Sequence, residues 1–196
     1  MNEKSLKLYR FWSSTRWFIN LGIKTFDFIG SKYDKLKAGD LNIAKTKMSA
    51  LKSISKDNDV SSINRICDIF KKDNYIWRSD PLKGKFDYKS DPMITVANKT
   101  GDCDDFATLW CSLYPQFDRY SIFSDDVKSG HVIAIGKIND SYMVVSNIKQ
   151  LGCYQVDSPE KALIEASKDW FTNGELYCFM KFNKKGTLEY IKVYPY

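Results

Sequence analysis

Apolar residues recur every three or four positions through much of the first 115 residues, which is the spacing of one face of an α-helix. This spacing predicts helices over residues 41–54 and 60–71. The second helix carries a stripe suited to burial in a core, made of Ile63, Ile66, Cys67 and Phe70. Residues 72–99 break the pattern with two prolines and a glycine, so we expect a long loop or several short extended pieces there.

The first 30 residues are rich in aromatic side chains. Leu8, Phe11 and Trp12, and then Phe18 and Leu21, have helical spacing with lysine and arginine between them. An amphipathic helix of this kind can pack on the body of the protein, bind a protein partner or lie on a membrane surface. We expect packing on the domain, and contact with another protein through this segment stays open.

From about residue 118 the pattern changes to short runs of β-branched and aromatic residues. RYSIFS, HVIAIGKI and YMVVSNI predict three strands, the last two joined by a hairpin turn at Asn139 and Asp140. SPEKALIEASKDWF predicts a helix that Ser158 caps, with Pro159 at its first position. ELYCFMKF and LEYIKVYPY predict two closing strands with Gly186 in the turn between them.

The length and composition fit one folded domain with an extension. We expect a helical, basic and aromatic N-terminal extension over residues 1–70 and an α+β domain over residues 71–196. A content of 43% apolar and 28% charged residues is typical of a soluble globular protein. The apolar run over residues 17–23 is too short to cross a bilayer and lacks a signal-peptide cleavage site. We therefore expect no transmembrane segment and a cytoplasmic protein, or a virion component if a phage encodes it.

Charge and cysteine content narrow the possible partners. Residues 1–80 hold 16 Lys or Arg and 9 Asp or Glu, so the surplus behind the net charge of +6 lies there. No nucleic-acid-binding motif accompanies it, so we expect a solvated helix face and no specific nucleic acid partner. The five cysteines have no CxxC spacing, which predicts free thiols and no zinc site. We expect no cofactor.

The segment TGDCDDFATLWC places Cys103 among three carboxylates at the start of a helix predicted over residues 103–114. Asp102 is a natural N-cap, and Asp104 and Asp105 suit the positive end of the helix dipole. A helical wheel places Cys103 on the buried stripe, with Asp104 and Asp105 on the solvent side. The carboxylates would raise the pKa of the thiol, so a reactive Cys103 needs a cationic partner.

His131, the single histidine of the sequence, is the candidate for that partner. A thiol titrates near about 8.5 and an imidazole near about 6.5, so an ion pair between them allows a thiolate at neutral pH. The imidazolium can then protonate a leaving amine, and N–H groups at the helix start can stabilise an oxyanion. Cys103 and His131 together predict acyl transfer by a thiol nucleophile.

The imidazole also needs an acceptor that orients it, and the following strand can supply one. If the hairpin loop has an even number of residues, Ser146 shares the face of His131, and if it has an odd number, Asn147 does. We favour Asn147, because its amide carbonyl is the better acceptor for an imidazole N–H, and keep Ser146 as the alternative.

GDCDDFA, followed by GHV at the start of a strand and a hairpin ending in VVSN, resembles the transglutaminase-like cysteine peptidase superfamily, especially its bacterial and phage members. The likeness covers about residues 70–150 and leaves residues 1–65 unexplained. It implies a papain-like α+β core in which the helix bearing the cysteine packs on an antiparallel sheet carrying the histidine. It also implies a Cys thioester intermediate in the cleavage or exchange of an amide bond of a protein or peptide substrate.

By position, the resemblance makes Cys103 the nucleophile and His131 the base. Many relatives have an aspartate where this chain has Ser146, and the departure keeps a second function open. In that alternative a weak or inactive transglutaminase-like fold serves as a structural or binding component of a larger assembly such as a phage virion.

Some bacterial relatives bind calcium through acidic residues beside the cysteine. Asp102 and Asp104 match those positions, although we expect no metal.

Overall fold

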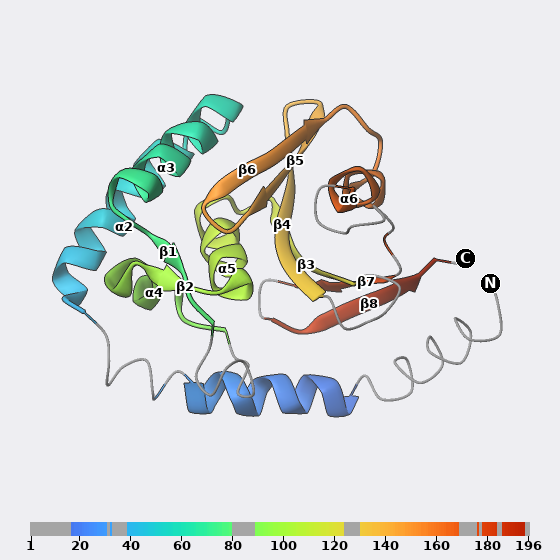
Figure 1. Ribbon diagram of the computed structural model, residues 1–196, viewed down its shortest axis with the longest axis horizontal. Helices are drawn as coiled ribbons and strands as arrows, with labels where there is room; N and C mark the ends of the chain where they lie inside the picture. Colours follow the sequence, from blue (N-terminus) through green and yellow to red (C-terminus); the bar gives the residue numbers. More distant parts are fainter. Residues whose placement is uncertain are drawn as a thin grey trace.

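The computed structural model describes residues 17–30, 32, 39–79, 89–123, 130–168, 176, 178–183 and 186–194. Its centre is a six-stranded antiparallel sheet with the strand order β6-β5-β4-β3-β7-β8 (Figure 1). The strands are β3 (Phe117–Phe123), β4 (Gly130–Ile138), β5 (Ser141–Ser146), β6 (Lys149–Tyr154), β7 (Cys178–Phe182) and β8 (Leu188–Val193). Helices pack on this sheet, which confirms the predicted α+β class.

The helices divide the core into two parts on opposite faces of the sheet. They are α2 (Leu41–Ser55), α3 (Val60–Lys72), α4 (Pro92–Asn98), α5 (Cys103–Leu113) and α6 (Pro159–Ser167). The larger core joins α2, α3 and α5 to one face of β4 and β5, through residues such as Trp110 and Ala134. The smaller core joins α6 to the other face, through residues such as Leu163 and Ile133. The helix that bears Cys103 therefore lies between the sheet and two further helices.

Local signals in the sequence set the ends of these elements. The helices predicted over residues 41–54 and 60–71 are α2 and α3, capped by the side chains of Asp40 and Asp59. Ser158 caps α6, as predicted, with Pro159 at its first position. The hairpin between β4 and β5 turns at the expected residues, where Asn139 has a φ of 52°.

The region that we expected to be a loop or extended pieces contains a short helix, α4, so that prediction was wrong in part. Asp91 accepts a hydrogen bond from the N–H of Met93, and Pro92 occupies the first helical turn, where its missing N–H has no cost. The described part of this region also includes β1 (Ile76–Trp77), which pairs in parallel with β2 (Thr100–Gly101). That pair fixes the segment leading into Cys103.

A helix over residues 17–30, called here the N-terminal helix, packs along one side of the domain (Figure 1). Ile19 and Ile23 contact an apolar group on β7 and β8 formed by Met180, Phe182 and Leu188. This is the packing on the domain that we expected, while Leu8, Phe11 and Trp12 lie outside the described residues. No helix in the described part of the chain is long and apolar enough to cross a membrane. The division of the chain at residue 70 stays a prediction.

Candidate active site

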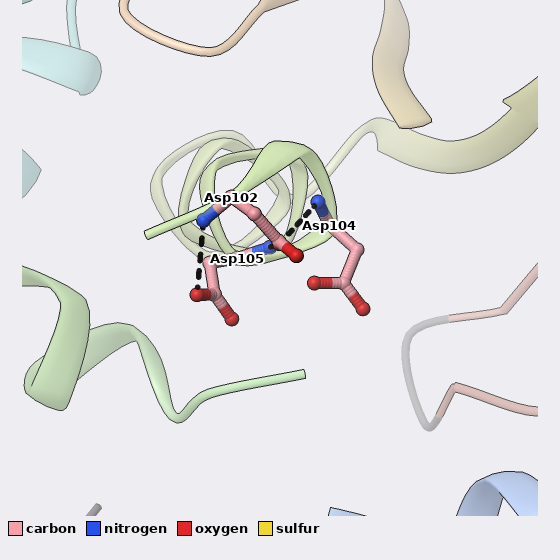
Figure 2. A group of neighbouring side chains, drawn as sticks. All are labelled: Asp102, Asp104 and Asp105. Atoms are coloured by element: carbon pink, nitrogen blue, oxygen red, sulfur yellow. Dashed lines mark hydrogen bonds between the residues drawn. The ribbon is translucent and has the colours of Figure 1, made fainter. Parts of the chain in front are cut away.

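Two of the three carboxylates around Cys103 hold the start of α5 in place. Asp102 Oδ1 accepts the N–H groups of Asp104 at 3.2 Å and Asp105 at 3.5 Å (Figure 2). In return, Asp105 Oδ2 accepts the N–H of Asp102 at 3.2 Å, and its Oδ1 accepts the N–H of Ser90 at 2.6 Å. These reciprocal bonds form a capping box that satisfies N–H groups which the helix itself cannot. The caps fix the position of the cysteine between them.

The helical wheel was wrong to place Asp104 and Asp105 on the solvent side. Asp105 is only 3% exposed, and Asp104 Oδ2 lies 3.8 Å from Arg119 Nη1 on β3. Burial, followed by the negative charge of Asp102, raises the pKa of Asp104 well above its ordinary value. A wheel gives the direction of a side chain but not the neighbours that cover it, and here β3 and the segment around Ser90 cover this side.

The acidic group has the donor chemistry of a calcium site. Carboxylate oxygens of Asp102, Asp104 and Asp105 lie within 4.8 Å of one another. Asp104 Oδ1 is buried and has no hydrogen-bond partner within the described part of the chain. Hard divalent cations take oxygen ligands of this kind. Because the Asp105 oxygens already accept N–H groups, Asp102 and Asp104 are the residues that fit a cation.

Cys103 and His131 line the same cavity, which has a volume of about 540 Å³. Alternation along β4 turns Val132 and Ala134 toward α5, whereas His131 shares the other face of the sheet with Ile133. The cysteine and the histidine therefore approach the cavity from opposite faces. They share it at the end of the sheet where β3 finishes and β4 begins.

The imidazole contacts Ser146, which we kept as the alternative to Asn147. His131 Nε2 and Ser146 Oγ are 2.7 Å apart. Ile138 pairs with Ser141 across a two-residue loop, so the hairpin has the even register that puts Ser146 on the histidine face. Asn147 lies in the following turn, where its backbone oxygen accepts the Trp110 Nε1–H at 2.8 Å.

Burial makes His131 a neutral group in the folded protein. It lowers the pKa of the imidazole to about 4, with a smaller contribution from the positive charge of Lys149. At pH 7 one ring nitrogen is therefore unprotonated, so the imidazole can accept a proton. The imidazolium–thiolate pair that we expected from the sequence is not supported as the resting state.

Arg119 also lines the cavity, and the sequence did not single it out. It is 7% exposed, and its guanidinium lies 4.8 Å from the centre of the Phe182 ring. The available signal was its place in the strand RYSIFS, where alternation puts a positive charge on an inward face. Arg119 brings the positive charge that faces Asp104.

Replacing His131 by glutamine should reduce the loss of stability on acidification. The unfolded histidine binds its proton at about pH 6.5 and the folded one at about pH 4, so the free energy of unfolding falls as the pH drops through this interval. The contribution is at most on the order of 3 kcal/mol, reduced where solvent reaches the ring. Asp104 acts in the opposite direction, so the measurement is the difference between wild type and variant in urea unfolding at successive pH values. Equal pH slopes would contradict a buried neutral imidazole.

Comparison with known proteins supports the fold. No protein-family model matches the sequence, and no curated protein sequence matches it either. The structure is similar to calcium-bound LapG of Legionella pneumophila, with a TM-score of 0.50 and 16% identity over 83% of this chain and 84% of that chain. EGTA-treated LapG (TM-score 0.41, 16% identity, 65% of this chain and 73% of that chain) and another LapG structure (0.39, 15%, 78% and 97%) are less similar. The chain has the transglutaminase-like fold.

Proposed function

We propose that the protein is a cysteine peptidase, amidase or acyltransferase of the transglutaminase-like type, acting on a protein or peptide. The observation that carries the proposal is the cavity shared by Cys103 and His131, with His131 hydrogen-bonded to Ser146. The calcium-bound LapG neighbour is a cysteine protease of the same fold, which supports the reaction class and not a particular substrate.

In the proposed reaction, neutral His131 takes the proton of the Cys103 thiol as the sulfur attacks an amide carbonyl. The carbonyl oxygen becomes an oxyanion, for which we assign the Cys103 N–H at the start of α5 as a donor. Collapse of this intermediate breaks the C–N bond, and the imidazolium gives its proton to the departing amine. A thioester remains on Cys103. Water or a second amine then attacks it and regenerates the thiol.

Ser146 has a positioning role in this scheme. Its hydroxyl holds the imidazole at Nε2, but it has no negative charge with which to stabilise the imidazolium that forms during the reaction. A carboxylate at this position would add that stabilisation. The serine therefore favours a slow enzyme, and it is also the observation that favours the alternative of an inactive, structural or binding component.

A calcium ion would fit beside this machinery through Asp102 and Asp104, as the calcium-bound LapG neighbour suggests. The ion would supply positive charge next to the helix start. Asp104 Oδ1, which is buried without a hydrogen-bond partner in the described structure, would then gain a ligand bond.

Iodoacetamide at neutral pH should alkylate Cys103 faster than Cys111 or the exposed Cys153, because His131 accepts the thiol proton. His131→Ala should lower the Cys103 rate by roughly tenfold or more. Mass spectrometry of peptides gives the rate at each thiol. The same variant and Cys103→Ala should abolish hydrolysis of an unfolded test protein. If Cys103 reacts no faster than the other thiols and its alkylation rate is the same in His131→Ala, the proposed site is not a catalytic one.

Ser146→Asp should raise the rate of hydrolysis by roughly tenfold, because a carboxylate stabilises the imidazolium, and Ser146→Ala should lower it. The matched control is Asn147→Gly. It keeps the backbone oxygen that Trp110 uses and suits the φ of 48° at this position, so it should leave the rate nearly unchanged. Circular dichroism checks that each variant folds. A larger loss in Asn147→Gly than in Ser146→Ala would overturn the role given to Ser146.

Millimolar calcium should raise the Tm of the metal-free protein if Asp102 and Asp104 bind the ion. At one hundred times the Kd the stabilisation is about 2.7 kcal/mol. Asp104→Asn should remove the calcium effect, and Asp157→Asn, which changes an exposed acid elsewhere, should retain it. An unchanged Tm in wild type with calcium would exclude the site and leave Arg119 as the cation that faces Asp104.

A further inference from the structure

The N-terminal helix forms one wall of the cavity that contains Cys103 and His131. From the helix, the cavity is lined by Ile19, Gly22, Ile23, Phe26 and Asp27. From the sheet, it is lined by an apolar group that includes Phe123, Val132 and Phe182. The helix therefore lies across the side of the domain from which a polypeptide would reach the thiol.

No residue of the helix from Trp17 to Ile29 is fully buried. Asp27 accepts the backbone N–H of Lys89 at 3.0 Å and forms an ion pair with its ammonium group at 2.9 Å. Asn20 Oδ1 accepts the N–H of Leu188 at 2.8 Å. Ile19 and Ile23, whose side chains are partly buried, pack on β7 and β8. We call these contacts the strap.

The outer face of the helix carries large exposed side chains. Trp17 and Phe18 are each 67% exposed and Phe28 is 64% exposed, so their apolar surfaces face solvent. A segment held by few buried apolar contacts opens at a lower free energy than the core of its domain. The N-terminal helix is in this respect unlike α5, which is surrounded by buried side chains.

The proposed reaction needs room that the helix takes. An amide carbonyl in a protein chain must approach Cys103 with polypeptide on both sides of the scissile bond, and side chains of the helix occupy one wall of the cavity that this chain would have to cross. The part of the surface beneath the helix that β7 and β8 form is apolar, and it would bind apolar side chains of a substrate through the same contacts that now hold Ile19 and Ile23.

We propose that the N-terminal helix is a displaceable cover that occupies the substrate-binding surface of the Cys103 site, and that the substrate replacing it is a protein segment with apolar side chains beside the scissile bond. This inference rests on the proposed function. While these contacts hold the helix in place, small reagents enter the cavity and polypeptide chains do not. When these contacts break and the helix moves away, Cys103 is accessible to a polypeptide.

The test compares two thiol reagents of different size on the full chain: iodoacetamide, and a maleimide carrying a long polyethylene glycol chain. Two variants weaken the strap independently, Asp27→Asn and the double change Ile19→Ser with Ile23→Ser. Asp157→Asn is the matched control, because it breaks an exposed ion pair with Lys161 away from the helix. Peptide mapping separates Cys103 from Cys153, which is exposed.

The large maleimide should label Cys103 slowly in wild type and in Asp157→Asn, and roughly 5- to 30-fold faster in both strap variants, the ratio expected from a change of one or two kcal/mol in the opening equilibrium. Iodoacetamide labelling should change much less. Equal labelling by the large reagent in wild type and strap variants, or slower labelling in the variants, would contradict the proposal and show that the helix is a fixed wall of the site.

Hydrolysis of an unfolded, apolar-rich test protein separates this inference from the function on which it rests. Hydrolysis that rises in the strap variants along with labelling supports both. If labelling of Cys103 by the large maleimide rises and no variant hydrolyses the protein, the proposal that the helix is a cover is supported and the proposed reaction is contradicted. If wild type already hydrolyses the protein at the rate of the strap variants and the labelling of Cys103 does not differ, the proposed reaction is supported and the proposal that the helix is a cover is contradicted.

Discussion

The packing of α5 against the sheet is the contact on which the site depends, and Trp110 is its centre. The side chain is fully buried, with its ring 5.5 Å from that of Phe70 on α3. Its Nε1–H donates to the backbone oxygen of Asn147, immediately after the strand that ends at Ser146. One side chain thus joins the helix that starts at Cys103 to the turn beside the residue that holds His131. A shift of α5 by a fraction of a turn would change both ends of the site together.

Charge and burial around the cavity set the protonation states of Asp104 and His131. Three carboxylates crowd the start of α5, two of them used as caps and the third, Asp104, partly buried and facing Arg119. Burial disfavours an imidazolium at His131, so the imidazole is neutral at rest. In the proposed reaction a positive charge forms on it only when it takes the thiol proton.

The elements were predictable from the sequence because periodicity and caps are local signals, and the site was predictable only in part. Cys103 and His131 could be paired from residue types alone, and the structure places them on one cavity. The choice between Ser146 and Asn147 depended on whether the hairpin loop had an even or odd number of residues, which the propensities of neighbouring residues do not settle. The burial of Asp104 and the inward position of Arg119 depend on which elements meet in the fold, and a single-element pattern contains no such information.

The position of the N-terminal helix and the proton affinity of His131 are physically linked. The low pKa of the imidazole comes mainly from burial, and part of the cavity wall around it is this helix. Removing the helix admits water to the cavity, which relaxes the desolvation and moves the pKa of His131 back toward its ordinary value near about 6.5. The helix therefore contributes to the low proton affinity of the imidazole. Opening the site would change both the access of a substrate and the ease with which the imidazole accepts the thiol proton.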